Sequence, residues 1–535
     1  MSKVFLYIGL ITLILAFLSF ISYFVYRASY DKYLDDCLNN RNVKRKKLIP
    51  DKYFAYFCMP FVIMSAILLL ISGLVALFGK EEVIKDNRNL EYTLLEDNTY
   101  EVTGLGKFSG YKLEIPEKHN GRTVTSIADE AFDNTHIKSV VIPGSIKTIG
   151  EYAFYGCQYL VDVKLGEGIK LINDYSFASC NALESITIPG SVSILGEKAF
   201  YSCGSLQEVK ISNGLEIIDN YAFSNCPNLV DVKLPDTLIS IGNDTFSYCT
   251  SLTKINIPNS VEKIFDRAFI YCRMLEQIIL PNSVKYLGKS VFLNCTSLST
   301  VMLSDNLDEL PESTFENCEN LSVVFLKSIK YIGEKAFMYS GISNFSIPDS
   351  VTVIGEKAFL GCRKLVYIEI PSSVKIIKND AFSTCINLQK VEFKYGLETL
   401  EDRVFNECTW LNNVILPDSV ISIGNATFMN CTSLSNVVLS NNLETIGDRA
   451  FLNCNIKSII IPKSIERLNS YIFENNKLLH SIYYCGTEEE WNDINIRQQG
   501  EGFSAKIYYY SKNKPQTDGK YWYYNSSNSP VRWED

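Results

Sequence analysis

Residues 358–380 read "AFLGCRKLVYIEIPSSVKIIKND", and residues 222–244 read "AFSNCPNLVDVKLPDTLISIGND". The same 23-residue phrase recurs along most of the chain, and one phenylalanine per copy sets its register, with steps of 22 or 23 residues. Sixteen copies in register predict a solenoid, in which each copy forms one coil and stacks on the next. The sixteen phenylalanines are Phe132, Phe154, Phe177, Phe200, Phe223, Phe246, Phe269, Phe292, Phe315, Phe337, Phe359, Phe382, Phe405, Phe428, Phe451 and Phe473.

Each copy follows the pattern A-F-x-x-C-x-x-L-x-x-V-x-I-P-x-S-V-x-x-I-G. Its V-x-I part alternates with period two, as in Ile186 and Ile188, which predicts a short strand with these two side chains pointing inward. A proline such as Pro189 cannot donate to a strand ladder and is expected to end the strand. Gly196 is expected to permit a turn, and the phenylalanine to fill the interior. One copy cannot bury its own apolar side, so stability must arise between neighbouring copies.

A cysteine follows the phenylalanine by three residues in thirteen copies, and stacking predicts an inward-facing column of small side chains. Thr135, Ser340 and Asn476 replace it elsewhere, so the position accepts any small, mildly polar residue. Disulfides are the alternative, because an exterior location favours them and neighbouring coils lie within bonding distance. We interpret the column as free thiols, since thirteen is odd and stacked Cβ atoms point the same way. The cysteines are Cys157, Cys180, Cys203, Cys226, Cys249, Cys272, Cys295, Cys318, Cys362, Cys385, Cys408, Cys431 and Cys454.

The first 79 residues are predicted to form a membrane anchor. Residues 4–25 carry no charge and would span about 33 Å as a helix, which is enough to cross a bilayer. Residues 53–78 are a second uncharged run, interrupted only by Pro60. A cleaved signal peptide is the alternative for the first run, but the run is too long and no small-residue cleavage site precedes Arg27.

Charge predicts the orientation of this anchor. Residues 1–79 carry nine Lys and Arg against four Asp, a net charge of +5, so the remainder carries about −14 within a total of −9. Eight of the basic residues lie in the loop 27–52, which the positive-inside rule keeps in the cytoplasm. We therefore predict a multi-pass plasma-membrane protein with its repeat domain extracellular. An inverted topology would instead make it a cytoplasmic regulator. The acidic remainder argues against a nucleic-acid partner.

The copy "AFYSCGSLQEVKISNGLEIID" (199–219) resembles the repeats of the BspA-type leucine-rich repeat family, and the resemblance covers about residues 90–480. It implies a curved solenoid of short parallel strands, one per repeat, in surface proteins that commonly bind macromolecules. Residues 80–131 are then a juxtamembrane segment and N-terminal cap, 132–480 the solenoid, and 481–535 an aromatic-rich C-terminal cap. The aromatic residues of this tail either cover the open end of the solenoid or stack on cell-wall sugars; they include Tyr521, Trp522, Tyr523 and Trp533.

The outward strand positions, eight and ten residues after each phenylalanine, are where a partner would bind. They are polar in the early copies, and then become apolar at Ile279, Met302 and the pair Val323 and Phe325. We predict an exposed apolar patch for a protein partner here. The alternative is that such residues only favour strand formation.

Three classes of function compete. The first is a non-enzymatic, membrane-tethered adhesin or receptor that binds proteins or other cell-surface macromolecules. The second is a structural surface-layer spacer without a specific ligand. An enzyme has the least support, because the sequence contains no nucleophile elbow, phosphate loop, zinc-ligand spacing or paired-acid motif. We expect no catalytic residue, no metal and no cofactor.

Overall fold

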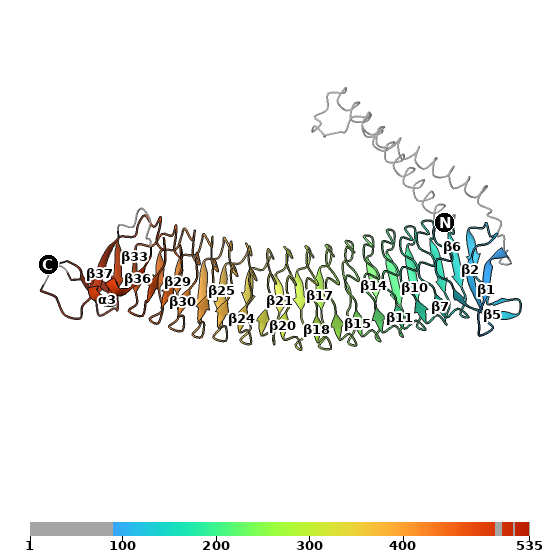
Figure 1. Cartoon of the computed structure of the whole chain (residues 1–535), viewed down its shortest axis with the longest axis horizontal. Coiled ribbons are helices and arrows are strands. Elements are labelled where there is room, and N and C mark those ends of the chain that lie inside the picture. The colour runs from blue at the N-terminus through green and yellow to red at the C-terminus, as the bar shows by residue number, and fades with distance from the viewer. Residues whose placement is uncertain (1–88, 498–504, 517–518, 534–535) are drawn as a thin grey trace, which may run out of the picture. The chain divides into compact units, whose positions relative to one another are not determined.

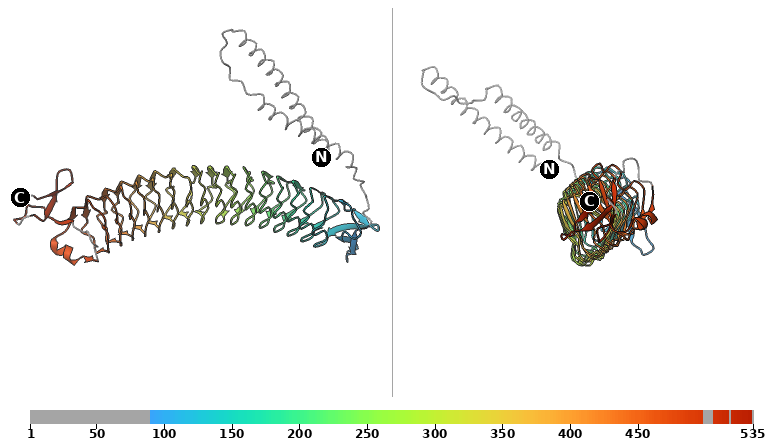
Figure 2. Two further views of the ribbon diagram at one scale, coloured as in Figure 1. Left: turned by 90° about the horizontal axis from the view of Figure 1, so that it is seen from above. Right: turned by 90° about the vertical axis from the view of Figure 1, so that its left-hand side faces the viewer.

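The computed structural model describes residues 89–497, 505–516 and 519–533, which belong to one compact unit, Asp86–Asp535. This unit is a gently curved solenoid of stacked coils (Figures 1 and 2). In the described residues no helix is long and apolar enough to cross a membrane. The two predicted membrane helices, 4–25 and 53–78, lie outside the described residues, as does the loop between them.

Every coil of the repeat except that of Phe246 contributes a strand of three or four residues, called here the long strand, where the V-x-I pattern predicted it. Ile186 and Ile188 are buried at 3% and 0% exposure, while Ser185 and Thr187 point outward. The long strands are β6 (Ser139–Ile142), β8 (Asp162–Leu165), β10 (Ser185–Ile188), β12 (Glu208–Ile211), β14 (Asp231–Lys233), β17 (Gln277–Ile279), β19 (Thr300–Met302), β21 (Val323–Phe325), β23 (Asn344–Ser346), β25 (Tyr367–Ile370), β27 (Lys390–Phe393), β29 (Asn413–Ile415), β31 (Asn436–Val438), β33 (Ser458–Ile461) and β35 (Ser481–Tyr484).

The prediction of one strand per repeat was wrong, because the V-x-x-I segment forms a second, two-residue strand. These short strands pair in parallel into two sheets that run from β7 to β18 and from β20 to β36. They are β7 (Thr148–Ile149), β9 (Leu171–Ile172), β11 (Ile194–Leu195), β13 (Ile217–Ile218), β15 (Ser240–Ile241), β16 (Lys263–Ile264), β18 (Tyr286–Leu287), β20 (Glu309–Leu310), β22 (Tyr331–Ile332), β24 (Val353–Ile354), β26 (Ile376–Ile377), β28 (Thr399–Leu400), β30 (Ser422–Ile423), β32 (Thr445–Ile446), β34 (Arg467–Leu468) and β36 (Asn495–Ile496).

The third wall of each coil, around the A-F pair, is a run of tight turns. In the coil of Phe200, Lys198 and Ser202 have φ of 54° and 56°, and comparable left-handed residues flank the other phenylalanines. This backbone aims the N–H groups of Lys198, Phe200 and Ser202 at carbonyl oxygens of the next coil, at 2.8–2.9 Å. Gly196 has a different role from the expected turn: a Cβ there would lie 2.7 Å from the backbone of Asn173, so glycine permits close packing of coils.

The sixteen phenylalanine rings form one file through the interior. Consecutive rings are stacked with centroids 4.9–5.8 Å apart, from Phe132–Phe154 to Phe451–Phe473. Offset stacking of this kind adds to the burial of apolar area. One continuous hydrophobic core extends from Leu90 to Tyr509, so each coil is stabilised mainly by its neighbours.

Both ends of the stack carry extra elements. The N-terminal end has β1 (Glu91–Leu94), β2 (Tyr100–Gly104), β3 (Lys112–Glu114), β4 (Lys118–His119) and β5 (Arg122–Ile127). The C-terminal end has α3 (Glu488–Asp493), β37 (Lys506–Tyr510), β38 (Tyr521–Tyr524) and β39 (Pro530–Arg532), and these strands extend the sheet of β33 and β35. Trp522 is fully buried there, and its indole N–H donates to the carbonyl oxygen of Tyr484 at 2.8 Å.

Candidate functional site

The predicted apolar residues lie on three neighbouring strands of the long-strand face, β17, β19 and β21. The first and last of these strands are labelled in Figure 1. The parallel register places Ile279 beside Met302 and Met302 beside Phe325, so the three side chains form one row across neighbouring strands. Their exposed fractions are 56%, 44% and 52%, and Val323 beside Phe325 is 39% exposed. We call Ile279, Met302, Val323 and Phe325 the apolar stripe.

The same strands also contribute to the core, and this alternation creates the stripe. Ile278 and Val301 lie between the outward residues in sequence and are 1% and 0% exposed. Because side chains alternate across a strand, each outward position can change without altering the core beneath it. The stripe therefore belongs to the surface and is not a consequence of core packing.

A cavity of about 660 Å³ opens beside the stripe, between β12 and β17. Its lining includes Asp231, Lys233, Lys254, Asn256 and Ile279. The long-strand ladder is interrupted here: residues 254–256 form no strand, and within the described chain the N–H groups of residues 254–257 donate to no backbone carbonyl. The cavity thus combines charged side chains with open backbone groups at one end of the apolar stripe.

Sequence reasoning did not find this cavity. The copy of Phe246 matches its neighbours in pattern, and its outward residues Lys254 and Asn256 are ordinary polar strand positions. The interruption is confined to the long-strand segment, because Phe246 stacks on Phe223 and Phe269 at 5.6 and 5.4 Å, as in the other coils. No local signal in the residues of this copy would have identified it.

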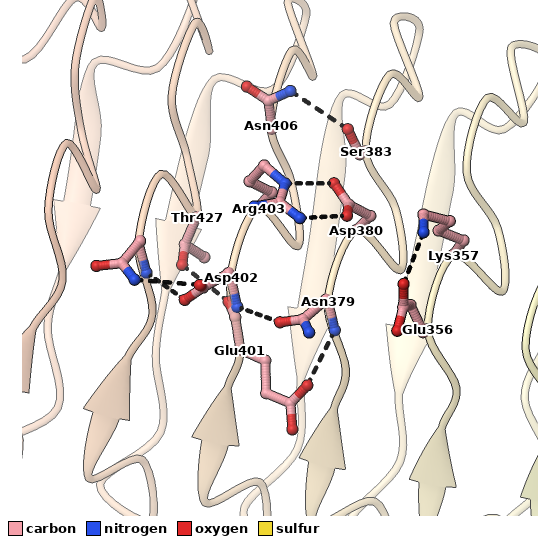
Figure 3. A network of polar contacts seen from close by, with 11 residues as sticks. Glu356, Lys357, Asn379, Asp380, Ser383, Glu401, Asp402, Arg403, Asn406 and Thr427 are labelled. Carbon is pink, nitrogen blue, oxygen red and sulfur yellow. Dashed lines mark hydrogen bonds and ion pairs between the residues drawn. The ribbon is translucent and has the colours of Figure 1, made fainter.

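A second cluster of charged and polar residues lies on the turns and serves the stacking of coils (Figure 3). The side-chain oxygen of Asn379 accepts from the N–H of Asp402 at 3.0 Å, and that of Asp402 accepts from the N–H of Asn425 at 2.7 Å. Arg403 donates two hydrogen bonds, of 2.9 and 2.8 Å, to the carboxylate of Asp380. Each acceptor is occupied by the neighbouring coil, so the cluster has a structural role.

The cysteine column is buried in the structure as free thiols. Twelve of the thirteen are fully buried and Cys454 is 7% exposed. Each thiol donates to the carbonyl oxygen of the phenylalanine in the preceding coil, as Cys272 does to Phe246 at 3.2 Å. Burial raises the pKa of the Cys272 thiol well above its usual range, because the thiolate would be poorly solvated there. The column is thus shielded from solvent and is a packing element.

The described residues contain no group of three or more His, Cys, Asp or Glu side chains placed to hold a metal ion. The acidic run that begins at Glu488 is the first turn of α3, where Thr487 and Glu490 form a reciprocal capping box. Such an arrangement satisfies the first N–H groups of the helix. Glu490 is therefore engaged in helix capping and in an ion pair with Lys463, and Glu488 in an ion pair with Lys520.

Comparison with one solved structure, at a TM-score of 0.50, shows the same fold, and two further similar structures score lower. A leucine-rich repeat protein from Bacteroides ovatus is 24% identical, with a TM-score of 0.50, over 80% of this chain and 99% of that protein. A leucine-rich cell surface protein from Faecalibacterium prausnitzii is 23% identical, with a TM-score of 0.39, over 78% and 97% of the two chains. The pneumococcal vaccine antigen PcpA is 19% identical, with a TM-score of 0.30, over 79% and 92%. No curated protein matches the chain.

The fold and its exposed strand face define a leucine-rich repeat solenoid, a class of protein that presents a long surface for contacts. The family model of the BspA-type leucine-rich repeat region matches residues 125–253, 239–366 and 352–480, which together span well over half of the chain. The chain belongs to the BspA-type leucine-rich repeat family, as the repeat pattern indicated.

Proposed function

We propose that this chain is a membrane-tethered cell-surface protein that binds a macromolecular partner through the apolar stripe, as an adhesin or receptor without enzymatic activity. The observation that carries the proposal is the register of Ile279, Met302 and Phe325, each more than 40% exposed on neighbouring strands. A contiguous row of large apolar side chains on a water-facing sheet is typical of an interaction surface. The open cavity beside it adds polar groups that would give such a contact specificity.

The location belongs to the same proposal. Two helices at 4–25 and 53–78 would hold the chain in the plasma membrane, and the basic loop between them would keep the solenoid outside the cell. Burial of the thirteen thiols protects them in an oxidising exterior, which makes an extracellular solenoid with free cysteines workable.

Binding of the fluorescently labelled chain to intact cells tests the proposal. Phe325→Asp and Met302→Lys place a charge in the stripe and are expected to weaken binding at least about tenfold, because a charge must be desolvated in the contact. Ile415→Asp is the matched control, since Ile415 is 53% exposed on β29, outside the stripe. Unchanged binding by folded stripe variants would contradict the proposal. A surface-layer spacer predicts that outcome, together with dense self-assembly of the chain and no binding to cells.

A further inference from the structure

The outward side chains of the long-strand face change in character along the solenoid in an ordered way. A rung is the long-strand segment of one coil. We number the rungs from β19, which contains Met302 and is rung zero. The row that contains Met302 has Lys233 three rungs and Lys210 four rungs toward the N-terminus. It has Glu369 three rungs and Glu392 four rungs toward the C-terminus. Basic and acidic positions therefore lie at equal distances on opposite sides of the apolar centre.

We propose that the partner of the apolar stripe is a second copy of this chain, packed face to face and antiparallel about a two-fold axis that passes through the Met302 rung. This inference rests on the proposed function, because it names the partner of the same surface. A two-fold contact requires a patch that is complementary to itself, so that each residue meets its counterpart on the opposite side of the axis.

The long-strand face meets this requirement. With the two-fold axis along the strand direction, Met302 faces Met302, and Ile279 of each copy faces Phe325 of the other. Large apolar side chains thus meet in the centre, where water is excluded. At the next rung outward, Asn256 faces Ser346, and both are neutral and exposed.

Charges of opposite sign meet at the following rungs. Lys233 faces Glu369, and Lys210 faces Glu392, each contact occurring twice in the pair of copies. In the neighbouring row of outward residues Glu208 faces Lys390. Inside one copy Lys210 pairs with Glu208, Lys390 with Glu392, and Lys394 with both Glu369 and Glu392. These pairs are half-exposed and can rearrange at little cost. Between rungs −4 and +4 no like charges face one another in these two rows.

An alternative, parallel pairing would place each rung against itself. Lys233 would then face Asp231, but Ile279 would face Gln277 and Met302 would face Thr300. Both arrangements set opposite charges against one another. In the parallel pairing only Phe325 of the Met302 row meets an apolar residue, Val323, whereas in the antiparallel one Ile279, Met302 and Phe325 all do. The antiparallel pairing also sets the N-terminal ends of the two solenoids at opposite ends of the pair.

Charge reversal in the full chain, kept in solution with a mild detergent, tests the pairing by sedimentation. Lys233→Glu alone and Glu369→Lys alone should each weaken self-association at least about tenfold, because each creates two like-charge contacts. An equimolar mixture of these two variants should associate like the wild type, since both contacts then have opposite signs. Lys164→Glu is the control: Lys164 lies in the same row but faces Val438, so this change should leave association within about twofold of the wild type.

Two results would overturn the inference. A wild-type chain that stays monomeric at all concentrations tested removes the second copy as the partner. Association of the wild type without rescue in the mixture shows a different pairing, the parallel one included. Binding to cells that lack the chain separates this failure from failure of the proposed function: if wild type binds such cells and Phe325→Asp does not, the stripe binds another partner and only the self-pairing is wrong.

Discussion

In thirteen coils, the cysteine thiol donates a hydrogen bond to a backbone carbonyl oxygen of the preceding coil. The bond from Cys272 to the carbonyl oxygen of Phe246 has an equivalent at each cysteine of the column. Burial raises the pKa of eleven of these thiols, including Cys454, whose pKa rises to about 12. The other ten are Cys157, Cys180, Cys203, Cys249, Cys272, Cys295, Cys318, Cys385, Cys408 and Cys431. The thiols thus contribute packing and one hydrogen bond each, provided that they stay protonated.

This protonation predicts how stability depends on pH. Thiols of the unfolded chain ionise near pH 8.5, whereas those of the folded chain keep their protons to higher pH. Above about pH 8.5 the unfolded state binds fewer protons than the folded state, so the free energy of unfolding falls as pH rises. Urea unfolding should therefore give a constant midpoint between about pH 7 and 8 and a decreasing one above.

A matched substitution identifies the thiols as the cause. Cys272→Ser keeps a donor of similar size, as Thr135 does naturally at the same position, but does not ionise in this range. The loss of stability between about pH 8 and 10 should be smaller in Cys272→Ser than in the wild type. An equal loss of stability in the variant and in the wild type would show that other titrating groups cause the pH effect. Thiol-specific alkylation at neutral pH should leave the thirteen column cysteines unmodified until the chain is unfolded.

At the scale of the element, the phenylalanine file connects the coils. Phe292 is stacked on Phe269 at 5.7 Å and on Phe315 at 5.6 Å, whereas Phe473 at the end of the file has one stacked neighbour, Phe451. In a solenoid the free energy of unfolding is the sum of coil terms and interface terms between neighbours. A change in mid-file therefore affects two interfaces, and a change at the end only one.

Phe292→Ala and Phe473→Ala test this difference. We expect Phe292→Ala to lower the free energy of unfolding by about 3–5 kcal/mol, because it leaves a cavity between two rings. It should also separate unfolding into two transitions, one for each half of the solenoid. Phe473→Ala should cost less and leave a single transition. Equal losses in urea unfolding of the two variants would contradict the nearest-neighbour account.

The strand elements divide their residues between core and surface, and the sequence shows this division well. Period-two alternation correctly predicted that Ile186 and Ile188 are buried and that Met302 and Phe325 are exposed. It missed the two-residue strands, because V-x-x-I is too short to show a period. It also missed the left-handed residues such as Lys198 and Ser202, since the neighbouring coil stabilises a backbone that these residue types rarely adopt alone.

For the whole molecule, the sequence predicted the family, the coil register and the position of the apolar stripe. The cavity between β12 and β17 was not predictable, because residues 254–256 form no strand although their copy follows the same pattern as its neighbours. The self-complementary order of charges is present in the sequence, but it becomes visible only when the register places Lys233, Met302 and Glu369 on one row of the same face. Long-range order of this kind depends on the stacking of coils and not on local pattern.

The core and the proposed binding surface use alternate residues of the same strands. Ile278 and Ile279 are adjacent on β17, with exposed fractions of 1% and 56%, and provide a direct test. Unfolding midpoint and binding to cells should be measured together for Ile278→Asn and Ile279→Lys. Ile278→Asn should lower the free energy of unfolding by about 2–4 kcal/mol, because it buries an unpaired amide. Ile279→Lys should change stability by less than about 0.5 kcal/mol while binding is lost. Binding that survives Ile279→Lys in a stable chain would contradict the account.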